Sequence, residues 1–401
     1  RSHTVTHLDG TSQTFQYSCC GPDTATDPDG LVTQYLYDAM GRQIGSTILS
    51  FNPPLTITNH LDPAGHTLRT VRNASGSIIC LSQSAYDSAG QLIAQTNALG
   101  GRTTSADSTD PQGQKVRTIT YPDGGTRIEL YYQDGQLAKL TGSAVSPARF
   151  EYGISQDNGT PREFSREIKL DSSGADTPEW TISFIDMLGR QYKTVFAATS
   201  TPYPYRQSFY NNRGQLVKQR DPDGVVTLFA YDPKGQLAYT ATDINRNDQI
   251  DFAGSDRITW TTNDVTSYSG YNVTRTRTFA FAANGSASTV PLSMSMSAAS
   301  GLKSWNIAYR DSSTPLTTLT ETFYGPNGSR TITTTAPDGS SVIRSFSYGR
   351  LMSETRKDAG GNPIGSTIYS YDWHGRVATA TDVRNGTTSF AYNNADQITY
   401  T

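Results

Sequence analysis

Hydrophobic and polar residues alternate along short stretches of this chain, and tight-turn sequences separate the stretches. In residues 221–237, DPDGVVTLFAYDPKGQL, the side chains of Val225, Thr227, Phe229 and Tyr231 alternate with their neighbours. A period of two is that of a β-strand with one buried face. The Pro and Gly residues of the flanking Asp-Pro-Asp-Gly and Asp-Pro-Lys-Gly sequences favour turns. The segment therefore predicts a β-hairpin.

The same layout recurs with its spacing preserved. A glycine is followed seven residues later by an aromatic residue at Gly10/Tyr17, Gly30/Tyr37, Gly124/Tyr131, Gly224/Tyr231 and Gly339/Phe346. The second half of the unit, aromatic-Asp-x-x-Gly-Arg/Gln, begins at Tyr37, Tyr86, Tyr231 and Tyr371, with weaker copies at Ile185, Tyr210 and Tyr392. Self-similarity at a regular spacing predicts a tandem array of hairpins.

This motif resembles the YD-repeat, or Rhs-repeat, family, which includes bacterial Rhs proteins, the shell components of insecticidal toxin complexes, and the animal teneurins. The resemblance covers nearly the whole chain. It implies an all-β, shell-like fold in which tandem hairpins form a long curved or spiralling antiparallel sheet around a hollow interior. A hairpin alone cannot bury its aromatic face, whereas stacked neighbours bury the faces and cover the strand edges. We expect the repeated Tyr to line one face and the repeated Asp to cap the following turn.

We predict one continuous repeat region over residues 1–401, an excerpt of a larger polypeptide. Residues 140–180 and 255–330 contain strand-like runs but few copies of the motif, so we expect irregular or degenerate repeats there. Residues 243–256 are expected to form an inserted acidic loop. No low-complexity linker divides the chain into independent domains.

The composition supports a folded β-protein. Hydrophobic residues make up only 35% and the mean hydropathy is −0.51, but 23 Tyr and 14 Phe argue against disorder, because aromatic side chains bury a large area each. The net charge of −3 and the pI near 6.0 give no electrostatic reason to expect nucleic acid or an anionic membrane as a partner. No run of about 18 apolar residues occurs, so no membrane span is predicted.

One segment has the spacing of a calcium loop. Its candidate metal ligands are Asp243, Asn245, Asn247, Gln249 (through its backbone carbonyl), Asp251 and Asp256. Oxygen-bearing side chains at positions 1, 3, 5 and 9 resemble loops of the EF-hand or dockerin kind. Asp248 stands where Gly is expected, and Gly254 where a bidentate Glu is expected. Bound Ca²⁺ and a plain Asp/Asn-rich turn between strands are both consistent with the sequence.

No catalytic residue is predicted. The five His are scattered, and no nucleophile elbow, phosphate-binding loop or His-Glu-x-x-His motif occurs. Among the three cysteines, Cys19 and Cys20 are adjacent, and a bond between them would close a strained ring. A bridge from one of them to Cys80 is an alternative. We expect instead that the thiols are buried and reduced.

The leading hypothesis is a structural scaffold, more plausibly not an enzyme, in a secreted or cell-surface bacterial protein. It would form part of a β-shell that encloses or displays another polypeptide. Its partners would be other repeats or domains of the same polypeptide and an enclosed cargo. One alternative is an extracellular glycan-binding module that uses exposed aromatics such as Trp260, Trp305, Trp373, Tyr203 or Tyr205. Another is a carbohydrate-active lyase or hydrolase built on the repeat scaffold.

Overall fold

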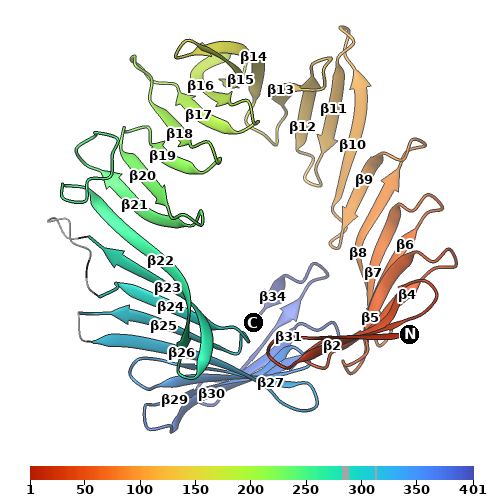
Figure 1. Ribbon diagram of the computed structural model, residues 1–401. Helices are drawn as coiled ribbons and strands as arrows, with labels where there is room; N and C mark the ends of the chain where they lie inside the picture. The colour runs from red at the N-terminus through yellow and green to blue at the C-terminus, as the bar shows by residue number, and fades with distance from the viewer. Residues whose placement is uncertain (282–287, 289, 312–313) are drawn as a thin grey trace. The chain divides into compact units, whose positions relative to one another are not determined.

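The computed structural model describes residues 1–281, 288, 290–311 and 314–401. In these residues the regular structure consists of 34 strands, with no helix and hence none that could cross a membrane. Thirty-two strands belong to one hydrogen-bonded sheet, and the last two form a separate pair (Figure 1). Within this sheet, nearly all consecutive strands of the described residues pair antiparallel. The predicted all-β fold of tandem hairpins is confirmed.

The chain divides into two compact units, each described here by itself. Unit 1 comprises residues 1–102, 263–277 and 293–401, and unit 2 comprises residues 103–262 and 278–292. Three strands have residues in both units: β10 (Arg102–Thr109), β22 (Arg257–Tyr268) and β23 (Tyr271–Ala280).

Unit 1 contains two runs of hairpins, each strand paired with the next in the sequence. The first run is β1 (Ser2–Thr6), β2 (Ser12–Tyr17), β3 (Pro22–Thr26), β4 (Val32–Tyr37), β5 (Gln43–Ile48), β6 (Leu55–Leu61), β7 (Thr67–Ala74), β8 (Ser77–Tyr86) and β9 (Leu92–Asn97). The second run is β24 (Ser293–Ala298), β25 (Lys303–Tyr309), β26 (Pro315–Tyr324), β27 (Ser329–Thr335), β28 (Ser341–Ser347), β29 (Arg350–Lys357), β30 (Pro363–Tyr371), β31 (Val377–Asp382) and β32 (Gly386–Ser389). The separate pair is β33 (Ala391–Tyr392) and β34 (Ile398–Tyr400).

Unit 2 continues the same pattern of consecutive antiparallel pairs. Its strands are β11 (Lys115–Thr120), β12 (Thr126–Tyr131), β13 (Leu137–Thr141), β14 (Ala148–Asp157), β15 (Thr160–Leu170), β16 (Asp176–Ile185), β17 (Gln191–Phe196), β18 (Tyr205–Tyr210), β19 (Leu216–Arg220), β20 (Val226–Tyr231) and β21 (Leu237–Asp243). Residues 140–180 include strands of 10 and 11 residues, longer than the strands of 5 to 7 residues around the YD motifs on either side.

The Asp of the YD motif holds the turn that follows it. Asp38 Oδ1 accepts the backbone N–H groups of Met40 and Arg42, both at 2.9 Å, and the Gly41 N–H donates to the Asp38 carbonyl at 3.0 Å. Gly41 has φ +78°, which a residue with a Cβ adopts only under strain. The same side-chain capping occurs at Asp87, Asp186, Asn211 and Asn393. The expected capping role of this position is confirmed.

The motif tyrosine ties each hairpin to the preceding one. At Tyr37 and Tyr231 the strand register shifts, as in a β-bulge. The hydroxyl of Tyr37 donates to the Pro22 carbonyl at 2.9 Å, and that of Tyr231 donates to the Leu216 carbonyl at 2.8 Å. Each bond reaches back 15 residues to the strand before. The tyrosine therefore couples neighbouring repeats, in addition to burying its ring.

The Arg or Gln that ends the motif makes the forward link. Arg42 binds its own Asp38 through Nε at 2.7 Å and the Asp62 carbonyl of the next turn through Nη1 at 3.1 Å. Gln215 bonds the Gly235 carbonyl, 20 residues on, at 3.1 Å. Each hairpin is thus fixed to both neighbours by side chains of the motif.

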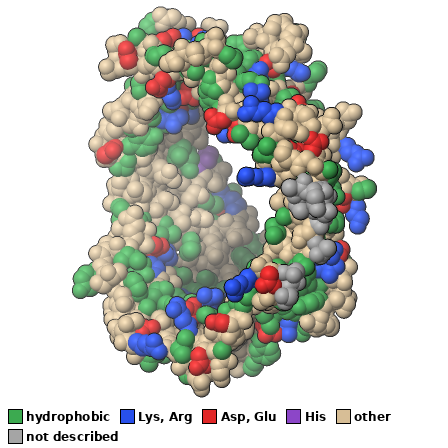
Figure 2. Space-filling view, turned by 90° about the vertical axis from the view of Figure 1, so that its left-hand side faces the viewer, with side chains coloured by type: hydrophobic (Ala, Val, Ile, Leu, Met, Phe, Trp, Pro, Cys, Tyr) green, Lys and Arg blue, Asp and Glu red, His purple; other side chains and the backbone are tan. Residues whose placement is uncertain are grey.

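Fully buried apolar cores are small. In unit 1, Val273, Met296, Ala298, Trp305 and Ile307 form one cluster. In unit 2, Val226, Leu228, Ala241 and Ile258 form another. Most other strand residues are half-buried, so hydrogen bonds between neighbouring hairpins contribute much of the order. Figure 2 shows side chains of both charge signs interspersed over the face in view.

Candidate functional site

Within unit 1, side chains of the first run of hairpins contact side chains of the second run and of the β33–β34 pair. We call this set the return contact; its members are Asp29, Phe51, Arg72 and Ser77 on one side and Arg330, Arg350, His374 and Asp396 on the other.

A bidentate ion pair lies in this contact. Arg72 on β7 donates from Nη1 and Nη2 to the two carboxylate oxygens of Asp396, at 2.8 and 2.6 Å. The two residues are 324 positions apart. Arg72 is only 8% exposed, and Asp396 also accepts from Arg376 Nη1 at 3.0 Å. The bonds from Arg72, and secondarily those from Arg376, hold the pKa of Asp396 below its usual value. Bidentate, charge-assisted bonds of this kind are the stronger class of hydrogen bond.

His374 lies beside this ion pair. It belongs to the YD turn between β30 and β31, is 8% exposed, and its Nε2 is 3.0 Å from Ser77 Oγ. Its Nδ1 is buried without a hydrogen-bond partner in the described part of the chain. Burial lowers the pKa of His374, and the positive charges of Arg72 and Arg376 lower it further, against the opposing carboxylates of Asp372 and Asp396. Together these effects favour the neutral form of the imidazole.

Two further pairs complete the return contact. The guanidinium of Arg350 lies over the Phe51 ring, 3.4 Å from its centre, and burial lowers the pKa of Arg350. Asp29 contacts Arg330 Nε at 3.1 Å. Burial raises the pKa of Asp29, and Arg330 only partly opposes this. A Cβ added to Gly328 would lie 2.6 Å from the Asp29 carbonyl oxygen, so backbone segments pack closely here. The contact therefore combines charge, stacking and close backbone approach.

The acidic loop follows β21 in unit 2, and its first position is its best buried. Asp243 is 3% exposed and accepts the backbone N–H of Asn247 at 3.2 Å and of Asp248 at 2.8 Å. Asp256, 9% exposed, accepts the N–H groups of Ile244 and Asp251, both at 3.0 Å. These two carboxylates close the loop at its base.

At the exposed end of the loop, two asparagine side chains donate to one carboxylate oxygen. Asp251 Oδ2 accepts from the amide of Asn245 and from the amide of Asn247, the latter at 2.6 Å. Gln249 is exposed and donates its N–H to Asn247 Oδ1 at 2.9 Å. Among the described residues, no three His, Cys, Asp or Glu side chains are grouped to hold a metal ion. Any cation here would thus draw part of its ligand set from the asparagine amides.

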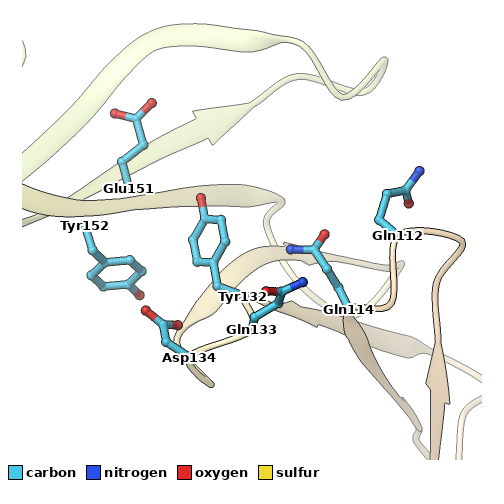
Figure 3. Close-up of a pocket in the computed structure, with 7 residues that line it drawn as sticks. All are labelled: Gln112, Gln114, Tyr132, Gln133, Asp134, Glu151 and Tyr152. Carbon is cyan, nitrogen blue, oxygen red and sulfur yellow. The ribbon is translucent and has the colours of Figure 1, made fainter.

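An open pocket of about 820 Å³ lies in unit 2, between the turns that follow β10 and β12 and the strand β14. It is lined by Gln112, Gln114, Tyr132, Gln133, Asp134, Glu151 and Tyr152. The rings of Tyr132 and Tyr152 meet edge to face, with centroids 6.3 Å apart (Figure 3). The Tyr132 hydroxyl donates to the Phe150 carbonyl at 2.8 Å, which fixes that ring.

Several polar side chains that line this pocket have no hydrogen-bond partner in the described residues. Glu151 is bound to Arg149 and Arg166, at 2.5 and 3.4 Å. By contrast, the side-chain amides of Gln112, Gln114 and Gln133 have no hydrogen-bond partner among the described residues. In Figure 3 the Asp134 carboxylate lies beside the Tyr152 ring. Burial raises the pKa of Tyr152, and Tyr132 and Asp134 add to this. The pocket therefore presents two aromatic rings, three free side-chain amides and the Tyr152 hydroxyl, with no Lys or Arg in its lining.

The aromatics singled out in the sequence have different environments. Trp305 is 5% exposed and belongs to the unit 1 core, so it offers no outer face. Trp260 is half-buried and stacks on Phe279, with centroids 4.9 Å apart. Tyr203 packs edge to face on Trp180, and both Lys193 and Arg220 lie over the Tyr205 ring. Trp373, at 57%, is well exposed.

The cysteines are not placed as expected. All three are free, but Cys19 and Cys20 are exposed in the loop between β2 and β3, and Cys80 is half-buried on β8. The expectation of buried thiols is therefore wrong for the first two, because this hairpin loop projects from the sheet. Their sulfur atoms lie 2.9 Å apart.

Comparison with known proteins supports the repeat assignment. The family model for the RHS repeat matches residues 210–247, which include two of the YD motif copies. The chain therefore contains an RHS repeat, and its resemblance to the YD-repeat, or Rhs-repeat, family is confirmed. A curated relative, double-stranded DNA deaminase toxin A of Burkholderia cenocepacia (strain H111), is 24% identical over 207 residues. That match covers 50% of this chain but only 12% of the toxin.

Solved structures also match, at low similarity. The TcdB2-TccC3 crystal structure covers 94% of this chain and 25% of its own, at 11% identity and a TM-score of 0.27. The Photorhabdus luminescens Tc holotoxin pore covers 97% of this chain and 30% of its own, at 9% identity and a TM-score of 0.24. This chain therefore spans less than a third of each of these relatives.

Sequence reasoning missed the return contact and the pocket. Tyr132 directly follows a motif-like Tyr131, and Tyr152 lies in the stretch with few motif copies, so nothing in the repeat singles them out. A signal was present only for His374, the one histidine at this turn position; the other motif copies carry Met40, Ala89, Leu188, Arg213, Lys234 and Ala395 there.

Proposed function

We propose that this chain is a structural scaffold, part of a β-shell in a secreted or cell-surface bacterial protein that encloses or displays another polypeptide. The observation that carries the proposal is the return contact. A wall that surrounds something must fasten strands far apart in the chain, and the pair of the buried Arg72 with Asp396 joins residues 324 positions apart within unit 1. Such a pair also specifies which strands meet.

The side-chain links between repeats support the same function. The motif Tyr reaches the preceding hairpin and the motif Arg or Gln reaches the next, so each unit is restrained on both sides. In arrays of this kind, stability is roughly the sum of repeat and neighbour terms, and no single core is required. Repeats that are linked in this way can form a stiff sheet although their buried apolar cores are small.

The relatives make a secreted setting the natural proposal. Two of them are described as a toxin and a holotoxin pore. The cargo and the export of the present protein are part of the proposal, since the chain spans only part of these relatives.

Electron cryo-microscopy of the protein that contains this chain tests the proposal. Repeat strands that surround or hold a separate polypeptide segment would support it, and strands with solvent on both faces would contradict it. Limited proteolysis adds a variant: Arg72→Ala should expose the enclosed segment to cleavage. Arg117→Ala, which removes a surface ion pair with Asp107 in unit 2, should not.

A second candidate function, glycan binding, is favoured by the Tyr132–Tyr152 pocket. Its volume lies within the roughly 300–1,000 Å³ typical of small-molecule sites. Aromatic faces with free amides suit the apolar faces and hydroxyl groups of a sugar ring, and the carboxylates with no lining cation favour a neutral glycan over an acidic one. A carbohydrate-active enzyme remains the third proposal; release of shortened products in a binding assay would favour it.

Titration of neutral oligosaccharides, followed by NMR, tests glycan binding. Tyr152→Ala should weaken binding by roughly two- to tenfold through loss of the aromatic face, whereas Tyr152→Phe should keep most of the affinity. Tyr17→Ala is the matched control, since Tyr17 is 40% exposed beside Phe15 in unit 1, outside this pocket. No binding by the unmodified protein would exclude this function.

We also propose that the 243–256 loop binds Ca²⁺. A cation at Asp251 would replace the two asparagine N–H donors, with the amides turned to present their oxygens. Calorimetry with CaCl₂ should show binding that Asp251→Asn weakens, because Ca²⁺ affinity depends on ligand charge. Asp232→Asn is the control, since this turn position already carries Asn at residues 211 and 393. Equal heats for the two variants would support the plain-turn alternative.

A further inference from the structure

The loop between β2 and β3 presents two neighbouring thiols to solvent. Cys19 and Cys20 are both exposed, and their Sγ atoms are 2.9 Å apart, against roughly 2.0 Å in a disulfide bond. A backbone hydrogen bond from the Ser18 N–H to the Gly21 carbonyl, at 3.0 Å, closes the loop around them. The fold therefore directs two side chains toward each other that an extended backbone would point to opposite faces.

The hydrogen bond between the thiols affects their chemistry. Contact with Cys19 raises the pKa of the Cys20 thiol above its usual value. Cys80 lies elsewhere, on β8, where its thiol faces the Ser82 carbonyl at 3.6 Å.

We propose that Cys19 and Cys20 are a redox modification site that forms a disulfide within the loop by exchange with a small-molecule disulfide such as oxidised glutathione. One thiolate attacks a sulfur of the reagent, leaving a mixed disulfide on the protein and releasing one reagent thiolate. The neighbouring cysteine then loses its proton to solvent and attacks the protein sulfur, releasing the second. Two S–H bonds are replaced by one S–S bond; the protein loses two hydrogens and the reagent gains two.

The position of the pair makes this bond easy to reduce. Consecutive Cα atoms are about 3.8 Å apart, closer than the roughly 4.4–6.8 Å usual across a disulfide. Closing the bond between adjacent residues therefore strains the loop, and strained, exposed disulfides are the labile ones. The site would respond to the surrounding thiol–disulfide balance, unlike a permanent cross-link.

Formation of the Cys19–Cys20 disulfide would affect the packing of the next repeat. A Cβ added to Gly41 would lie 3.6 Å from Cys20 Sγ, so this sulfur faces the YD turn of the following hairpin. A Cβ added to Gly21 would lie 2.6 Å from the Tyr37 hydroxyl, which bonds the Pro22 carbonyl. The loop is thereby packed on the tyrosine that links the two hairpins.

Trypsin separates the three cysteines for the test. No Lys or Arg lies between residues 2 and 42, so Cys19 and Cys20 stay in one peptide, and Cys80 falls in the peptide of residues 73–102. The folded protein is equilibrated with graded ratios of reduced to oxidised glutathione, alkylated and digested. We expect the 2–42 peptide to lose two hydrogens and escape alkylation, while the Cys80 peptide is fully alkylated. The change should reverse at reducing ratios.

Variants make the result specific. Cys80→Ser should leave the conversion unchanged, and Cys20→Ser should leave Cys19 alkylated or bound to glutathione. Three results would overturn the proposal: both cysteines alkylated at every ratio, a stable mixed disulfide with glutathione in the unmodified protein, or a link between the 2–42 and 73–102 peptides. Circular dichroism confirms that each variant is folded.

Discussion

Arg72 and Asp396 form a bidentate ion pair although 324 residues separate them. Arg72 is nearly buried, while the Asp396 side chain keeps 41% of its exposure. Removing either partner leaves the other charge unpaired. For a buried guanidinium, the free-energy cost of this unpaired charge exceeds the net stabilisation that the pair itself contributes. The pair therefore acts mainly by disfavouring any arrangement in which these strands fail to meet.

The return contact should weaken in mild acid through His374. Its pKa in the folded state is lowered from 6.5, so the folded protein binds fewer protons there than the unfolded chain does. The stabilisation by neutral His374 is therefore complete above about pH 6.5 and is lost as pH falls toward the lowered pKa. Trp373, 57% exposed and adjacent, is a fluorescence reporter.

We expect the Trp373 signal or the protection of nearby amides to change between about pH 7 and pH 5. His374→Gln should flatten this dependence. His66→Gln is the control, because His66 is a half-exposed histidine paired with Asp62 in another YD turn, and it should leave the profile as it is. A profile that is the same in all three proteins would show that His374 does not govern the contact.

Removing one motif hydroxyl should destabilise the link between repeats. Tyr231→Phe deletes the 2.8 Å bond to the Leu216 carbonyl and leaves the ring in place. The expected loss is about 0.5–1.5 kcal/mol in the free energy of unfolding of unit 2, measured in urea. Tyr239→Phe is the matched change in the same unit, since the Tyr239 hydroxyl has no hydrogen-bond partner in the described residues; equal losses for both would refute a linking role.

Gly328 is required where the backbone segments of the return contact meet. A Cβ there would lie 2.6 Å from the Asp29 carbonyl oxygen and 2.6 Å from the Tyr348 ring, at a φ of +69°. Gly386 has a similar φ of +82° but open space around it. Gly386→Ala should cost about 1–2 kcal/mol for the backbone alone.

Gly328→Ala should cost more than that and lower the thermal midpoint of unit 1 further. Differential scanning calorimetry of the two variants measures the difference. Equal thermal midpoints for the two variants would mean that the backbone segments around Gly328 and Asp29 can separate without loss of stability.

The repeat made much of the fold predictable. Tyr231 and Asp38 belong to a motif whose spacing fixes turns, strands and neighbours, and all these interactions lie within about 20 residues in the sequence. Arg72 and Asp396 lie in different repeats with no shared spacing, so no local pattern could pair them. Trp305 is a different case. Hydrophobic and polar residues alternate clearly in its strand, but which face of the strand is buried depends on packing against Val273 and Met296.

The spacing of oxygen-bearing residues predicted the acidic loop. It did not predict that two asparagine amides would donate to the Asp251 carboxylate. Residues 243, 245 and 247 were predicted to be metal ligands, and the structure brings the Asn245 and Asn247 side chains to one carboxylate oxygen of Asp251. The cysteine loop could not be anticipated, because adjacent residues in a strand point apart and only the turn geometry brings the two sulfurs together.

A double-mutant cycle on Arg72 and Asp396 tests the central claim most directly. Arg72→Ala, Asp396→Ala and the double variant are compared by hydrogen exchange of the amides in residues 69–74 and 391–400. If the return contact holds these segments together, each single variant raises exchange at both sites, and the double variant is little worse than either. Effects confined to the mutated segment, or strictly additive effects, would show that the two segments are not coupled and would contradict the scaffold account.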